Sequence, residues 1–142
     1  MDDAHDLDRF LKAQDDAYPD ALDELRAGRK RSHWIWFVFP QIAGLGHSPT
    51  ARHYAIRSLD EAQAYLAHPI LGARLHECLK VLQMLETADA RTVFGDLDAM
   101  KLRSSLTLFA EADPGDAIVQ AALERWFGGE RDEKTLQLLG RN

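Results

Sequence analysis

Residues 71–85 read LGARLHECLKVLQML, and their apolar side chains recur at intervals of three and four positions. Side chains with this spacing lie on one face of an α-helix. The positions on that face are Leu71, Leu75, Cys78, Leu79, Leu82 and Leu85. This is the strongest amphipathic pattern in the chain, and it predicts a central core helix.

The N-terminal part of the chain predicts two further helices. An apolar stripe begins at Leu7, and Pro19 follows Tyr18 in the sequence. Because proline favours the first position of a helix, we expect one helix to end at Tyr18 and the next to begin at Pro19. Gly28 should close the second helix near Ala27, since glycine adopts a left-handed cap without steric cost.

The segment 33–39 is apolar on nearly every side, and Ser32 precedes it. Serine is a favourable N-cap, so the pattern predicts a short buried helix that Ser32 caps. The alternative is a β-strand, because aromatic and β-branched residues favour strands. A lone strand would leave its backbone groups unpaired, and no convincing second strand is present, so we favour the helix.

Between positions 40 and 49 glycine and proline predict a long loop, after which helical spacing resumes near Thr50. Ser58 and Glu61 form a capping-box pattern, in which each side chain bonds the other residue's backbone amide. We expect this helix to stop at His68, before Pro69.

Four sequence features predict the helix boundaries in the C-terminal half. We expect a turn over 92–95 and a helix that begins with the acidic residues Asp96 and Asp98. Asp116 should cap the next helix, and Asp132 should begin the last one. The sequence therefore predicts an all-α fold, a compact orthogonal bundle of about eight to ten short helices, with residues 1–142 forming a single domain.

Composition narrows the class of protein. Hydrophobic residues make up 46% of the chain and the formal net charge is −6, so we expect a packed core and no extended binding to nucleic acid. Cys78 is the only cysteine, and no signal-peptide core follows the acidic N-terminus, which together predict a cytoplasmic protein. The longest apolar run, 34–39, is too short to span a membrane.

The first candidate site is the basic run that leads into the apolar segment. Its cations and its predicted helix start would both attract an anion, and the residues concerned are Arg29, Lys30, Arg31, His33 and Trp34. The alternative is a solvated connector before a core helix. Trp34 and Trp36 could stack on a ring-shaped ligand, but core packing is the commoner role of such large side chains.

A second basic and polar patch occurs within a later helix and comprises Lys101, Arg103, Ser104 and Ser105. Serine is a mediocre helix former, so this patch indicates either a polar site or close packing between helices. The six histidines form no metal-binding motif, so we expect no metal and no cofactor. Cys78 lies on the core stripe, where a buried, unreactive thiol is expected.

Several long motifs resemble the domain-of-unknown-function family eighteen-ten. They read ELRAGRKRSHWIWFVFPQIAGLG at 24–46, YAI at 54–56 with SLDEA at 58–62, KLRSSLTLF at 101–109 and FGGERD at 127–132. The resemblance covers about residues 6–139 and implies a mainly helical fold, but no activity. The chain has no repeated inhibitory segment of the kind implied by the name calpastatin, which is sometimes given to such proteins.

Three functions remain open. The favoured one is a binding module for an anionic small molecule or peptide beside the segment Arg29–Gly46. The second is an enzyme for a phosphate-bearing or nucleotide-like substrate, in which Arg31, His33, Lys101 and Arg103 hold charge and His33 is the acid or base. The third is a structural protein-interaction domain. The oligomeric state is not determined by the sequence.

Overall fold

The computed structural model describes residues 3–141, so Met1, Asp2 and Asn142 lie outside the described residues. Within that range the chain forms eight α-helices and no β-strand, which confirms the predicted all-α class. The helices are α1 (Asp8–Arg26), α2 (Ile35–Val38), α3 (Pro49–Tyr54), α4 (Leu59–Ala67), α5 (Leu71–Gln83), α6 (Ala90–Ala112), α7 (Ala117–Phe127) and α8 (Glu133–Leu138).

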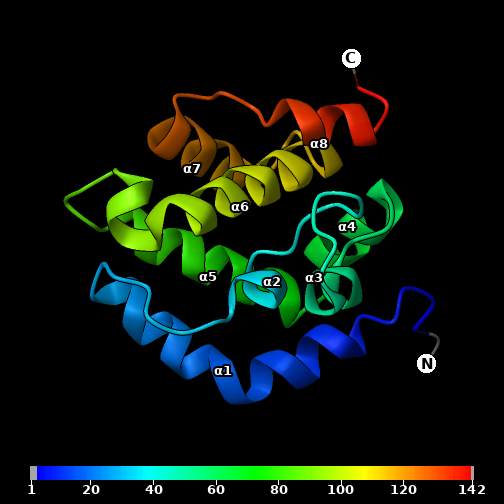
Figure 1. Ribbon diagram of the computed structural model, residues 1–142, viewed down its shortest axis with the longest axis horizontal. Helices are drawn as coiled ribbons and strands as arrows, with labels where there is room; N and C mark the ends of the chain where they lie inside the picture. Colours follow the sequence, from blue (N-terminus) through cyan, green and yellow to red (C-terminus); the bar gives the residue numbers. More distant parts are fainter. Residues whose placement is uncertain (1–2, 142) are drawn as a thin grey trace.

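The helices pack in a compact arrangement around α6, which crosses the middle of the molecule (Figure 1). α1 lies along one edge, and α7 and α8 lie along the opposite edge. α6 contacts α4, α7 and α8, whereas α5 packs against α1, α4 and α7. Among the described helices, none combines the length and the apolar character needed to cross a membrane.

The predicted core face of α5 is confirmed, but α5 is not the most enclosed helix. Leu71, Leu75, Cys78, Leu79 and Leu82 are buried, and the other side of the helix faces solvent. Leu85, which the prediction included, lies beyond the end of α5 and is only partly buried. In α6, every residue from 104 to 110 is buried. The difference arises because α4, α7 and α8 cover different sides of α6, an arrangement that the stripe of one helix cannot reveal.

The prediction of two helices on either side of Pro19 is wrong, because α1 continues through this residue. Pro19 removes one backbone hydrogen bond, which normally bends or ends a helix. Here Pro19 lies on the exposed side, whereas Ala21, Leu22 and Leu25 are buried beyond it. Packing of that face therefore keeps the chain helical, and α1 is bent near its middle (Figure 1).

Two helix starts also differ from the prediction. α2 begins at Ile35 and has no side-chain cap, because the Ser32 hydroxyl donates to the Glu24 carboxylate instead. The segment 92–95 is not a simple turn: α6 already begins at Ala90 under the cap of Asp89, and Gly95 interrupts it with φ 81° and ψ 166°. That left-handed backbone is open to glycine and strained for other residues.

Four other predicted boundaries are confirmed. Asp116 and Asp132 cap α7 and α8, and α4 ends at Ala67 with His68 as its C-cap. Gly28 follows the end of α1 with a φ of 72°. The capping box at the start of α4 is only half formed, because the Ser58 hydroxyl accepts from the Glu61 amide at 3.1 Å while the Glu61 side chain points elsewhere.

The Glu61 carboxylate binds Arg9, whose side chain is also buried. The two side chains are 2% and 3% exposed, and their nearest charged atoms lie 2.6 Å apart. The guanidinium of Arg9 also donates to the carbonyl oxygens of His53 and Ala55, and to two carbonyls just before α1. This side chain therefore joins α1, the α3–α4 connection and α4.

We expect Leu75→Ala and Leu79→Ala each to lower the free energy of unfolding by about 2–5 kcal/mol, because each empties a buried leucine site. Urea denaturation measures this change. Lys80→Ala is the matched control on the exposed face of the same helix, and it should shift the midpoint little. Equal shifts for Leu79→Ala and Lys80→Ala would contradict the assigned face.

We expect Arg9→Met to destabilise the protein by about 3–5 kcal/mol, because it leaves the Glu61 carboxylate buried without its partner. The double variant Arg9→Met with Glu61→Leu should be less destabilised than the sum of its single changes, since no buried charge remains. Urea unfolding of the four species tests this. Strict additivity would show that the two side chains act independently.

Candidate functional site

The structure separates the basic run 29–33 into buried and exposed members. Lys30 and Trp34 are covered, and the ammonium of Lys30 lies 4.9 Å from the centre of the Trp34 ring. Arg29, Arg31 and His33 are exposed, and within residues 3–141 none of them forms an ion pair with another side chain. Trp34 is 1% exposed and so packs in the core, where an external ring cannot stack on it.

Glu24 supplies a carboxylate at the position where the sequence predicts a bound anion. It accepts the backbone amides of Arg31 and Ser32 at 2.6 and 2.8 Å, the Ser32 hydroxyl at 2.6 Å and the Trp34 indole N–H at 3.1 Å. Partial burial acts to raise the pKa of Glu24, but these donors outweigh it and lower the pKa to about 2. The donors of this segment are therefore used by the protein itself.

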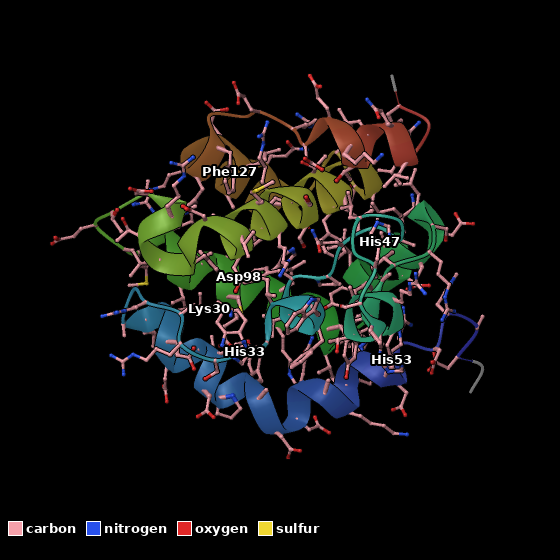
Figure 2. All side chains as sticks on the ribbon, viewed as in Figure 1. Lys30, His33, His47, His53, Asp98 and Phe127 are labelled. Carbon is pink, nitrogen blue, oxygen red and sulfur yellow. The ribbon has the colours of Figure 1, made fainter. Side chains whose placement is uncertain are left out.

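The two basic segments do meet in space, through Asp98. The ammonium of Lys30 lies 2.7 Å from one carboxylate oxygen of Asp98, and that of Lys101 lies 3.2 Å from the other. Figure 2 shows Lys30 and Asp98 together near the centre of the molecule. Lys101 also lies over the Trp36 ring, at 4.9 Å from its centre. Asp98 was not among the predicted site residues, although its spacing from Lys101 by three positions is a signal for a helical ion pair.

Arg103 and Ser104 have partners outside the basic run. The guanidinium of Arg103 donates to the carbonyl oxygens of Glu130 and Arg131, both at 2.9 Å. Ser104 bonds Met100 and Asp132, while Ser105 is fully buried without a hydrogen-bond partner among the described residues. Arg103 therefore holds the α7–α8 connection against α6, and it does not share a cleft with Arg31 and His33.

One hollow opens between the loop 41–46 and α6, and we call it the loop hollow. Its volume is about 320 Å³. The residues that line it are Gln41, Leu45, Gly46, Leu97, Met100, Lys101, Ser104, Asp132 and Lys134. It lies beside the end of the predicted Arg29–Gly46 segment and includes one of the predicted cations, Lys101.

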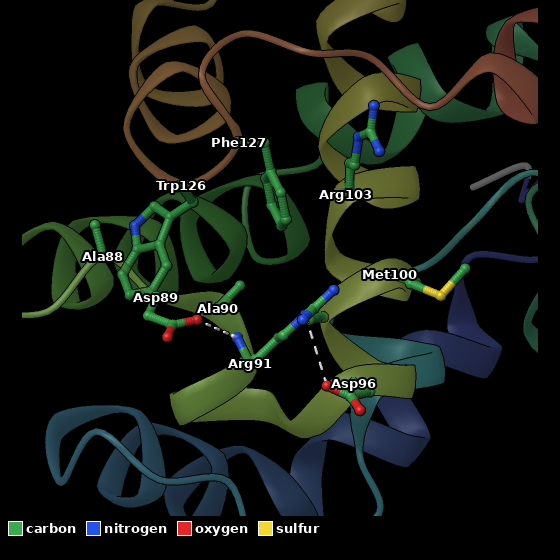
Figure 3. Close-up of a pocket in the computed structure, with 10 residues that line it drawn as sticks. Ala88, Asp89, Ala90, Arg91, Asp96, Met100, Arg103, Trp126 and Phe127 are labelled. Carbon is green, nitrogen blue, oxygen red and sulfur yellow. Dashed lines mark hydrogen bonds and ion pairs between the residues drawn. The ribbon is translucent and has the colours of Figure 1, made fainter.

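A second hollow, of about 440 Å³, lies between the first half of α6 and the end of α7, and we call it the α6–α7 cleft (Figure 3). Its lining residues are Ala88, Asp89, Ala90, Arg91, Asp96, Ala99, Met100, Arg103, Trp126 and Phe127. The two hollows share Met100. Predicted residue Arg103 lines this cleft, and Arg91 was missed.

Leu97 and Met100 border these hollows and were also missed by sequence reasoning. They are 74% and 67% exposed, which is unusual for large apolar side chains. A signal was present, because both fall outside the apolar stripe of their helix formed by Leu102, Leu106 and Phe109. Because side chains three positions apart are neighbours on a helix surface, Leu97 and Met100 form a small exposed apolar patch, and such patches are typical of interaction or ligand-binding surfaces.

The histidines and the cysteine are candidate metal ligands, and the cysteine is also a candidate nucleophile. Among residues 3–141 there is no group of three or more His, Cys, Asp or Glu side chains that could hold a metal ion. His47 and His53 lie well away from His33 (Figure 2). Cys78 is buried as predicted, and burial raises the pKa of its thiol to about 12, so the reactive thiolate is disfavoured.

The fold and these hollows define a small protein that is all-helical over the described residues. Residues 4–139 match the model of the family described as protein of unknown function (DUF1810), and the chain belongs to this family. It is similar to the crystal structure of the conserved hypothetical protein Rv1873 from Mycobacterium tuberculosis, with 49% sequence identity and a TM-score of 0.94. The similarity covers 97% of this chain and 99% of that one. Among curated proteins, none matches the chain.

We expect Glu24→Gln to lower stability at neutral pH by on the order of 1 kcal/mol, because it keeps the shape of the side chain but removes its charge. A carboxyl group whose pKa is depressed on folding stabilises the protein above its ordinary pKa of 4.5. The difference between wild type and variant should therefore shrink as the pH falls from about 4.5 towards 2.

Urea unfolding over this pH range tests the role of Glu24. Asp23→Asn is the matched control, because Asp23 is exposed and makes only a 3.8 Å contact with Arg26. A difference between wild type and Glu24→Gln that does not vary with pH would contradict the proposed ionised state of Glu24.

Proposed function

We propose that this protein is a binding module whose loop hollow takes a small molecule with one anionic group and an apolar body. The observation that carries the proposal is the position of Lys101, whose ammonium lies beside a hollow with a mainly apolar wall. The hollow adjoins the Arg29–Gly46 segment, where an anionic ligand is expected from the sequence.

The charges behind the hollow favour an anion. Lys30 and Lys101 share the single carboxylate of Asp98, so this group of three side chains carries an excess positive charge. Lys30 is almost fully covered, at 5% exposure, whereas Lys101 is 28% exposed and lines the hollow. An ammonium has three N–H donors, so Lys101 can bind Asp98 and a ligand together. The lining also holds the exposed cation Lys134 and the carboxylate of Asp132, so its net charge stays positive.

The apolar part of the ligand would lie against Leu45, Leu97 and Met100. The last two are largely exposed to water, so covering them is favourable by about 25 cal/mol per Å² of apolar surface. Methionine is flexible enough to fit ligands of different shape. A hollow with an apolar wall and few polar groups is typical of small-molecule sites.

The geometry gives less support to the two alternatives. The enzyme hypothesis required Arg31 and His33 to join Lys101 and Arg103, but the first two do not line the hollows that hold the others. The interaction hypothesis is favoured by exposed large apolar side chains, among them Met84, Leu97 and Met100. Binding of an anion at Lys101 separates the proposed function from the interaction hypothesis.

The proposal predicts that 8-anilinonaphthalene-1-sulfonate binds the folded protein more tightly than the neutral analogue N-phenyl-1-naphthylamine. Both probes have a similar aromatic body, so the difference isolates the anionic group. Lys101→Met should weaken sulfonate binding roughly five- to tenfold, because it removes a charged donor and keeps an apolar stem. Fluorescence titration measures both affinities.

Lys80→Met is the matched control, because Lys80 is exposed on α5 and lines neither of the two hollows. Lys101→Met should still fold, since Asp98 keeps its 2.7 Å contact with Lys30, and circular dichroism checks this. Equal sulfonate affinity in Lys101→Met and Lys80→Met, or equal binding of the two probes to the wild type, would refute the proposal.

A further inference from the structure

We propose that the α6–α7 cleft is a second binding site, and that its ligand is a zwitterion with an aromatic side chain, chemically a free aromatic α-amino acid. This inference goes beyond the anion site of the loop hollow and uses different charged residues. It rests on the charges, the spare hydrogen-bonding atoms and the apolar floor of the cleft.

The charged side chains that line the cleft are balanced in sign. Arg91 and Arg103 are the cations, and Asp89 and Asp96 are the anions. A ligand with only negative charge would be repelled by the two carboxylates, and one with only positive charge by the two guanidiniums. Because complementary potentials favour binding, the cleft fits a molecule that carries both signs.

These side chains also have atoms to spare for a ligand. The guanidinium of Arg91 forms no hydrogen bond with another described residue, and Nη1 of Arg103 is likewise free among them. One carboxylate oxygen of Asp89 accepts the Arg91 amide, whereas the other has no partner within residues 3–141. A carboxylate could therefore bind a guanidinium here while an ammonium binds an aspartate.

The ion pair inside the cleft is weak enough to be replaced. Arg91 and Asp96 approach only to 3.6 Å, and their side chains are 80% and 83% exposed (Figure 3). Exposed pairs of this kind contribute about 0–1 kcal/mol, so a ligand can exchange this contact for its own at small cost. The buried pair of Arg9 and Glu61 shows the contrast, because both side chains are almost fully covered and Arg9 also donates to four backbone carbonyl oxygens.

The floor of the cleft suits an aromatic ring. Ala90 and Ala99 are small and nearly buried, and Trp126 and Phe127 bring two rings from the end of α7 (Figure 3). The indole N–H of Trp126 already donates to Gln83 at 3.0 Å, so this residue offers the cleft an apolar surface. The volume of about 440 Å³ is within the usual range for small-molecule sites.

Titration of ¹⁵N-labelled protein with L-tryptophan, followed by amide chemical shifts, tests the site. Shifts should concentrate at Arg91, Asp96, Arg103 and Phe127. Two matched probes each lack one charge: indole-3-propionate has no ammonium and tryptamine has no carboxylate. Each should bind at least about tenfold more weakly than L-tryptophan, because one charged hydrogen bond is lost.

Two variants separate the roles of the charges. Arg91→Gln should weaken binding of L-tryptophan by about tenfold. Asp96→Asn should weaken L-tryptophan but strengthen indole-3-propionate, because it removes a carboxylate that repels this probe and releases Arg91. Arg57→Gln is the control, since Arg57 is exposed and lines neither hollow.

The inference is overturned if L-tryptophan gives no shifts at its solubility limit, if the shifts lie outside the cleft, or if either single-charge probe binds as tightly. It is also overturned if Arg91→Gln behaves like Arg57→Gln. The sulfonate titration of the loop hollow should be unchanged in Arg91→Gln. The Arg91→Gln variant therefore tests the cleft, and the Lys101→Met variant tests the anion site of the loop hollow separately.

Discussion

Arg9 places a positive charge in the interior, at the junction of α1, α4 and the chain between α3 and α4. A buried charge is costly unless it is fully paired, and here five acceptors surround one guanidinium. Because all five acceptors must stay close to the guanidinium, the segments that carry them are held in place. The side chain of Glu61 is consequently directed to Arg9 and leaves the capping box at the start of α4 half formed.

The same constraint reaches the loop hollow through the backbone. Arg9 binds the carbonyl of Ala55, and the next residue, Ile56, pairs with the loop: it donates to the carbonyl of Gln41 and accepts from the amide of Ala43, both at 2.8 Å. The loop 41–46 is therefore positioned from one side by the Arg9 junction. From the other side, α6 is connected to the segment before α2 by the contact of Lys30 with Asp98. One ionic contact thus helps to position the loop that lines the hollow, and the other connects α6, which also lines it, to the segment before α2.

The sequence predicted those features that depend on neighbouring residues. The apolar face of α5 and the caps formed by Asp116 and Asp132 were predicted correctly, because each is determined within a few positions of the chain. The continuation of α1 through Pro19 was not, since it depends on packing against other helices. The prediction of a complete capping box at Ser58 was wrong for the same reason, because Glu61 binds Arg9, which lies 52 positions away in the sequence.

The candidate site shows that local sequence also does not reveal which charged side chains are already paired in the fold. The run 29–33 has the composition of an anion site, but a carboxylate eight positions before Ser32 accepts its free donors, and Asp98 pairs with Lys30. A basic stretch in a protein with a formal net charge of −6 has many carboxylates of the same chain available to it.

What matters for binding is the charge left after these pairs are formed. By that criterion the proposed sites lie on α6 and not on the exposed connector, because Lys101 shares its carboxylate with Lys30 and Arg91 is held only loosely by Asp96. Incompletely paired cations beside exposed Leu97 and Met100 combine charge with an apolar surface, and the two small-molecule sites that we propose on α6 rest on this combination.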